Sequence, residues 1–94
     1  LSCKKHIILG MMANKDHNEY MRYFKDIASL TTIDIPNQPN AIKGNALKKK
    51  LKNFTNVQTK NTIEEAISSI IIQKNDIVLI TGSLYLAGEV LNLN

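Results

Sequence analysis

The fold is decided by one stretch of the sequence, Asp76-Ile77-Val78-Leu79-Ile80-Thr81-Gly82-Ser83. Residues 76–81 form a mostly apolar run with the length of one strand, which is typical of a strand in a buried parallel sheet. Gly82 ends the run because glycine permits a tight turn, and Ser83 can cap a following helix. That helix is predicted over residues 84–91, where Leu84, Ala87 and Leu91 share one face.

Three more strands and three more helices are predicted upstream of this stretch, in alternation. The strands span residues 6–10, 31–35 and 56–59, and the helices span residues 16–28, 45–53 and 62–71. Asp16 and Thr62 are predicted helix N-caps, and each is followed three residues later by a Glu. Strands separated by helix-length crossovers are expected to be parallel. The sequence therefore predicts an α/β fold, a three-layer Rossmann-like arrangement whose mostly parallel sheet has about four strands, with about four helices.

Each upstream helix carries side chains at helical spacing that are expected to face the core. In chain order they are Tyr20, Met21, Phe24, Ile27, Ala28, Leu47, Leu51, Phe54, Ile63, Ala66, Ile67, Ile70 and Ile71. Lys48, Lys49, Lys50 and Lys52 are expected to face solvent, and they lie in the most basic part of the chain. A nucleic-acid-binding face is the alternative for these lysines. No aromatic side chains interleave them for stacking on bases, so we expect no nucleic-acid partner.

Composition excludes several classes of protein. The chain has 94 residues, enough for one small domain. Its longest apolar run, residues 7–13, is far shorter than the about 20 residues of a membrane span, so we expect no membrane partner. The single cysteine, Cys3, cannot form an internal disulfide, and with two histidines it offers no metal-ligand spacing. We therefore expect no metal site, and a reducing, cytoplasmic location.

Two predicted loops have the composition of an anion-binding site. Residues 10–16 follow the first strand and Thr81-Gly82-Ser83 follows the last, at the edge where ligands of open parallel sheets gather. Ser83 adds a hydroxyl to free backbone N–H groups, and Lys15 adds an ammonium. The simpler interpretations are a helix cap for Ser83 and a solvated charge for Lys15. Neither Gly-x-x-x-x-Gly-Lys-Ser/Thr nor Gly-x-Gly-x-x-Gly occurs, so the chain has no phosphate-cradling loop of its own.

Four motifs, in order along nearly the whole chain, resemble the C-terminal domain of the folylpolyglutamate synthase / dihydrofolate synthase family, in the Mur ligase superfamily. The most specific is the segment 76–91, which contains Thr-Gly-Ser-Leu-Tyr. The other three are Ile7-Ile8-Leu9-Gly10-Met11 with Asn14-Lys15-Asp16, then Ile35-Pro36-Asn37-Gln38-Pro39, and then Thr62-Ile63-Glu64-Glu65-Ala66.

The resemblance implies an ADP-forming ligase in which ATP and Mg activate a folate or pteroate carboxylate as an acyl phosphate, which the amino group of L-glutamate attacks. This domain would close over the ATP site and help to bind glutamate. The resemblance assigns glutamate binding to Ser83, Gly82, Thr81 and Lys15, a catalytic role also to Lys15, and a supporting or capping role to Asp16. ATP and Mg would be bound mainly by a preceding central domain, and neither is expected in this chain alone.

The start of the chain departs from the family pattern. The family's domain opens with a strand and an Asp-x-Ala-His-Asn-type segment that reaches the nucleotide, and nothing before His6 supplies it. Residues 1–94 are therefore expected to be a glutamate-ligase domain without its first strand-helix unit and its central domain, inactive alone. The full enzyme is expected to be a monomer, and this chain is expected to self-associate through an open sheet edge. The alternative function is a stand-alone α/β module that binds an anionic metabolite.

Overall fold

A computed structural model of the chain describes residues 3–83, so the helix predicted over residues 84–91 lies outside the described part. Four strands form one sheet in the order β3-β2-β1-β4, and every neighbouring pair is parallel. The elements are β1 (Lys5–Leu9), α1 (His17–Met21), β2 (Ser29–Thr32), α2 (Gly44–Lys50), β3 (Gln58–Thr59), α3 (Ile63–Ser69) and β4 (Ile77–Thr81). The alternation of strands and helices confirms the predicted α/β fold.

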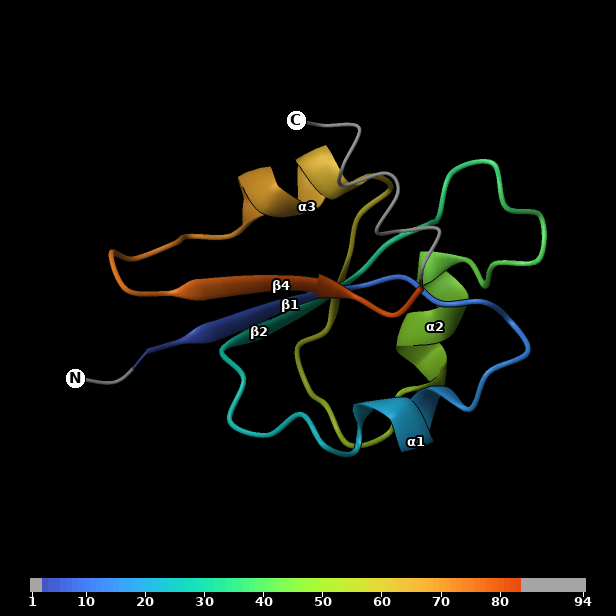
Figure 1. Cartoon of the computed structure of the whole chain (residues 1–94), viewed down its shortest axis with the longest axis horizontal. Coiled ribbons are helices and arrows are strands. Elements are labelled where there is room, and N and C mark those ends of the chain that lie inside the picture. Colours follow the sequence, from blue (N-terminus) through green and yellow to red (C-terminus); the bar gives the residue numbers. More distant parts are fainter. Residues whose placement is uncertain (1–2, 84–94) are drawn as a thin grey trace.

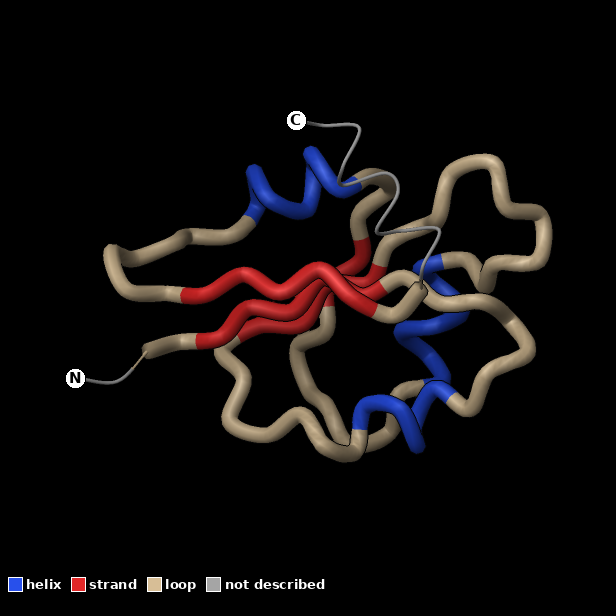
Figure 2. The backbone as a smooth tube through the Cα atoms, in the orientation of Figure 1, coloured by secondary structure: helices blue, strands red, loops and turns tan. Residues whose placement is uncertain are grey.

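Helices cover both faces of the sheet. α3 lies on one face, and α1 and α2 lie on the other, as Figures 1 and 2 show. Successive side chains of a strand point to opposite faces, and the core is accordingly divided into two clusters. One cluster includes Ile7, Leu9, Met21 and Leu47, and the other comprises Ile8, Ile33, Ile63 and Ala66. This arrangement confirms the predicted three layers.

Both predicted N-caps are present. The Asp16 side chain accepts a hydrogen bond from the Glu19 backbone N–H, at 3.0 Å, where α1 begins. Thr62 Oγ1 accepts from the Glu65 backbone N–H, at 3.1 Å, where α3 begins. Each cap satisfies one of the backbone donors that the first turn of a helix leaves free. None of the helices within residues 3–83 has the length and apolar character needed to cross a membrane.

The first helix is shorter than predicted, because it ends at Met21 and not near Ala28. The N–H of Phe24 donates to the Met21 carbonyl, three residues back, and Asp26 then adopts a φ of 57° that reverses the chain. After this turn, the Ala28 N–H donates to the Lys5 carbonyl, so that β2 begins beside β1. Met21 is nevertheless fully buried, whereas Tyr20 is 36% exposed, at the boundary of the core.

Strand β2 begins and ends earlier than predicted, at Ser29 and Thr32 instead of residues 31–35. Its limits are set by β1, because Ser29 pairs with His6 and Thr32 pairs with Leu9, the last residue of β1. Ile33 and Ile35 are buried beyond the paired segment. Apolar character therefore predicted the burial of these residues, and hydrogen bonding to the neighbouring strand determined where the strand ends.

The remaining boundaries differ in detail. α2 spans Gly44–Lys50 instead of residues 45–53, although Leu47 and Leu51 are buried and the four lysines are exposed as predicted. β3 is reduced to Gln58–Thr59. The predicted inner face of α3 is correct for Ile63 and Ala66 but wrong for Ile67 and Ile71, which are exposed. α3 ends at Ser69, and Ile70, which follows with an extended backbone, still packs against the core.

Strand β4 lies at one edge of the sheet and is only partly covered. Within residues 3–83 it pairs with β1 alone. Val78 and Ile80 pack against the core cluster beneath α3. Ile77 and Leu79 point to the opposite face, where 53% and 42% of their surfaces are exposed. β4 has the sequence pattern most typical of a buried strand, yet it is only half buried, because it lies at the edge of the sheet.

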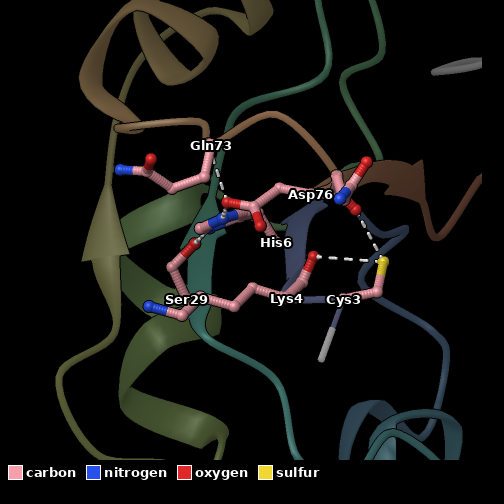
Figure 3. A network of polar contacts seen from close by, with 7 residues as sticks. Cys3, Lys4, His6, Ser29, Gln73 and Asp76 are labelled. Carbon is pink, nitrogen blue, oxygen red and sulfur yellow. Dashed lines mark hydrogen bonds and ion pairs between the residues drawn. The ribbon is translucent and has the colours of Figure 1, made fainter. Parts of the chain in front are cut away.

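A polar network holds β4 at the amino end of the sheet (Figure 3). The ring of His6 is nearly buried, and its Nε2 donates to Asp76 Oδ2 at 3.0 Å. Its Nδ1 then accepts from the Ser29 hydroxyl at 2.8 Å, since a neutral imidazole has one donor and one acceptor. The Gln73 N–H donates to the same carboxylate oxygen at 2.9 Å. The network joins the starts of β1, β2 and β4, and its two hydrogen bonds to the His6 ring are partly buried.

Asp76 makes the stability of the domain depend on pH. The Gln73 N–H and then His6 stabilise its carboxylate and lower its pKa below the ordinary value of 3.8. A lowered pKa stabilises the folded state above the unfolded-state pKa, and this contribution is lost as the pH falls through the folded-state pKa. We expect the free energy of unfolding to fall from about pH 5 to about pH 3, and to fall less steeply in Asp76→Asn.

Urea unfolding at a series of pH values measures this dependence. Gln73→Ala is the matched control, because it retains the backbone N–H that donates to Asp76, and its pH slope should equal that of the wild type. Equal slopes in Asp76→Asn and the wild type would show that the carboxylate of Asp76 does not carry the effect.

The first residue of α2 packs directly on the sheet. The Gly44 N–H donates to Asp34 Oδ1 at 2.7 Å, and the Gly44 carbonyl accepts from Thr32 Oγ1 at 2.8 Å. A Cβ atom at this position would lie 3.0 Å from Thr59 Cγ2 and 3.2 Å from the Ile33 carbonyl carbon. The second of these is backbone and cannot rotate away. A side chain at this position would therefore require α2 and the strands to move apart by a few tenths of an ångström.

Gly44→Ala is therefore expected to lower the free energy of unfolding by about 1 kcal/mol or more, since overpacking outweighs the gain in helix propensity. Urea unfolding of the two proteins gives the difference directly. Asn45→Ala, at an exposed position of the same helix, should cause no loss. A stabilised Gly44→Ala variant would contradict the close packing of α2 on β2 and β3.

Candidate functional site

The two predicted loops meet at the carboxyl edge of the sheet. Leu9 and Thr81 are paired in register at the ends of β1 and β4, and the Gly10 N–H donates to the Thr81 carbonyl at 3.2 Å. Gly82 has a φ of 116°, and a Cβ atom there would lie 2.3 Å from the Gly10 carbonyl oxygen. The backbones of the two loops are thus in direct contact, and both the conformation and the space at position 82 require glycine.

A third loop completes this edge. Met12 pairs with Ala41 in an isolated antiparallel bridge. On either side of the bridge, the Ala13 N–H donates to the Asn40 carbonyl at 2.8 Å, and the Ile42 N–H donates to the Met11 carbonyl at 3.0 Å. The loop that contains Pro36 and Pro39 therefore supports the loop that carries Lys15. Hydrogen bonds hold the Lys15 loop against the Pro loop, and its first residues lie against Gly82.

Lys15 and Asp16 occupy the end of the first loop. Lys15 is exposed, and its backbone N–H donates to the Met12 carbonyl at 3.4 Å. Asp16 caps α1, which fulfils one of the two roles expected of it. The ammonium of Lys15 is thus accessible at the carboxyl edge of the sheet, directly before a short helix.

Thr81 and Ser83 are both half-buried, on either side of Gly82. The Thr81 hydroxyl lies 2.5 Å from the Tyr20 phenol oxygen, and Ser83 is also engaged in a polar interaction. The edge therefore combines hydroxyl groups, backbone N–H groups and an ammonium. Such a set of donors suits a carboxylate or phosphate ligand.

Two side-chain contacts at this edge were not predicted from the sequence, one of His17 and one of Tyr20. His17 is buried, and its Nε2 donates to the Met12 carbonyl at 3.0 Å, so the imidazole closes the loop that holds Lys15. Tyr20 is predicted to lie on the core-facing side of its helix, and its hydroxyl also reaches the end of β4. His17 contacts a backbone carbonyl of the loop before its helix, and Tyr20 contacts a side-chain hydroxyl that is 61 positions away in the sequence. The spacing of side chains along one helix contains no signal for such contacts.

A metal cluster and a cavity are the other kinds of site that residues 3–83 could offer. Residues 3–83 contain no group of three His, Cys, Asp or Glu side chains that could hold a metal ion. A cavity of about 810 Å³ lies at the amino ends of β2 and β3, between residues 22–30 and 53–58. We locate the candidate site at the carboxyl edge, because ligands of parallel sheets bind where loops converge beyond the strand ends.

Comparison with known proteins relates the chain to ligases. The family described as "Mur ligase, glutamate ligase domain" matches residues 2–84. A crystal structure of folylpolyglutamate synthase from Thermotoga maritima is 26% identical, with a TM-score of 0.75 over 96% of this chain. That of the bifunctional folylpolyglutamate synthase/dihydrofolate synthase from Yersinia pestis, complexed with AMPPNP and Mn, is 16% identical, with a TM-score of 0.78 over 96% of this chain. The second likeness concerns the fold alone.

The chain spans about a fifth of the length of these two proteins, since it covers 21% of the first and 22% of the second. A search of curated protein sequences gave no significant match. The family match covers all of the described residues, including both loops of the carboxyl edge. This chain belongs to the Mur ligase family, as a glutamate ligase domain.

Proposed function

We propose that this chain is the C-terminal domain of an ATP-dependent ligase that joins L-glutamate to a folate or pteroate carboxylate. The observation that carries the proposal is the contact between Gly82 and Gly10, which brings the Ser83 loop and the Lys15 loop to one edge of a glutamate ligase domain. The likeness to the Thermotoga maritima folylpolyglutamate synthase supports folate as the class of substrate.

In the proposed reaction, the substrate carboxylate accepts a phosphoryl group from ATP, and the glutamate amine displaces phosphate from the resulting acyl phosphate, so that ADP and phosphate are released. Ser83 and the N–H groups around Gly82 hold a carboxylate of glutamate. Lys15 pairs with a carboxylate or with the charge that develops at the reacting phosphate. Closure of this domain on the ATP site aligns the amine with the acyl phosphate and excludes water.

The chain needs a further domain for this reaction. It contains no Gly-x-x-x-x-Gly-Lys-Ser/Thr motif, and the described residues form no metal-binding cluster, so ATP and Mg are assigned to a preceding central domain. Residues 1–94 then represent the glutamate-ligase domain without its first strand-helix unit. A cytoplasmic location and a monomeric full enzyme are parts of the same proposal.

Ser83→Ala and Lys15→Ala in the full-length enzyme should each raise the KM for glutamate by about tenfold, because each removes one donor to an anionic ligand. Steady-state ADP release at varied glutamate concentration measures the change. Lys48→Ala is the matched control, because this exposed lysine lies on α2 and belongs to neither loop of the candidate site. Unchanged glutamate kinetics in both variants would remove Ser83 and Lys15 from the site.

The gene region upstream of Leu1 should encode a Gly-x-x-x-x-Gly-Lys-Ser/Thr loop, and the isolated 94-residue chain should release no ADP with folate and glutamate. Sequencing of the upstream reading frame and a coupled ADP assay of the isolated chain check these two outcomes. An upstream frame without this loop would end the ligase proposal and favour a stand-alone module that binds an anionic metabolite.

A further inference from the structure

Two hydroxyl groups join helix α1 to the end of strand β4. Tyr20 Oη and Thr81 Oγ1 lie 2.5 Å apart, although the residues are separated by 61 positions in the sequence. Thr81 is the last residue of β4 and directly precedes Gly82. Tyr20 lies on the short helix that begins beside Lys15 and Asp16. This hydrogen bond therefore connects the helix that follows the Lys15 loop to the residue that precedes Gly82.

The Tyr20 phenol is held in place from two sides. Its backbone N–H donates to the Asp16 carbonyl at 3.1 Å, so the residue is one helical turn from the cap of α1. Its ring lies against the Phe24 ring, with a distance of 5.7 Å between the ring centroids, and Phe24 packs on the core. The hydroxyl group therefore has a fixed position relative to the Lys15 loop.

Among the described residues, one hydroxyl hydrogen of this pair has no acceptor. Tyr20 and Thr81 carry one hydroxyl hydrogen each, and the bond between them uses one of the two. If Tyr20 donates to Thr81, the Thr81 hydrogen remains available to a ligand at Gly82 and Ser83. The Thr81 backbone is itself fixed, because its carbonyl accepts from the Gly10 N–H. Such a hydroxyl is directed before the ligand arrives, and little conformational freedom is lost on binding.

We propose that Tyr20 is a positioning residue, which donates to Thr81 and orients the Thr81 hydroxyl toward a carboxylate of the incoming amino acid. This inference rests on the proposed function and deepens it, since it assigns part of the amino-acid specificity to a residue outside the binding loops. Tyr20 does not touch the substrate in this arrangement. Its effect passes entirely through Thr81.

Tyr20→Phe in the full-length enzyme tests the inference, because it keeps the ring on Phe24 and removes only the hydroxyl. We expect the KM for the amino acid to rise about fivefold, while kcat and the KM for ATP stay within about twofold of the wild type. Tyr23→Phe is the matched control, since Tyr23 is 71% exposed and its hydroxyl contacts Arg22. This control should leave all three constants unchanged.

A double-mutant cycle separates positioning from a general structural role. Thr81→Val should raise the same KM, Thr81→Ser should restore it, and Tyr20→Phe should add little to Thr81→Val. Additive effects of Tyr20→Phe and Thr81→Val would overturn the inference. An unchanged KM in Tyr20→Phe, or an equal loss in every kinetic constant, would overturn it as well.

The same assay distinguishes this inference from the proposed function. A wild-type enzyme that releases ADP with another amino acid, but not with glutamate, would overturn the proposed substrate alone. The KM for that amino acid would then test Tyr20 in the same way. A wild type that releases ADP with none of the amino acids would overturn both.

Discussion

Parallel pairing on both sides of β1 is the constraint on which the rest of the structure depends. Ile7, Ile8 and Leu9 are almost completely buried, and each pairs with a residue of β2 and a residue of β4. Because Leu9 is aligned with both Thr32 and Thr81, the three strands end at one level. The loops that follow them must therefore start side by side. The candidate site is a consequence of this register, since the residues of its two principal loops are far apart in the sequence.

The polar groups at the two ends of the sheet differ in whether they are paired with one another or accessible to a ligand. At the amino end, the His6 ring forms hydrogen bonds with Ser29 and Asp76 and so joins three strands. At the carboxyl end, the loops present hydroxyl groups, backbone N–H groups and the accessible ammonium of Lys15. Buried polar groups that satisfy each other specify one arrangement of the strands. Donors that remain accessible at the other end are available to a ligand, and mutations there need not disturb the strand register.

The sequence allowed prediction of the strand and helix order, both N-caps and the meeting of two loops, because these depend on local patterns and on the rules for parallel sheets. The ends of elements were less predictable. The limits of β2 depend on its pairing with β1, and α1 ends at the turn in which the Phe24 N–H donates to the Met21 carbonyl. The contacts of His17 with Met12 and of Tyr20 with Thr81 could not be predicted, because they require the positions of side chains in space.

The outer edge of β4 has a consequence for the behaviour of the domain in concentrated solution. Within residues 3–83 no strand pairs with this edge, and Ile77 and Leu79 place exposed apolar side chains on the same strand. Edge strands of this kind are where protein molecules in general can add to one another, whereas a net charge of +4 makes copies of this chain repel each other. Salt screens that repulsion and leaves the apolar attraction intact. Ionic strength is therefore the condition that sets the balance between charge repulsion and apolar attraction at this edge.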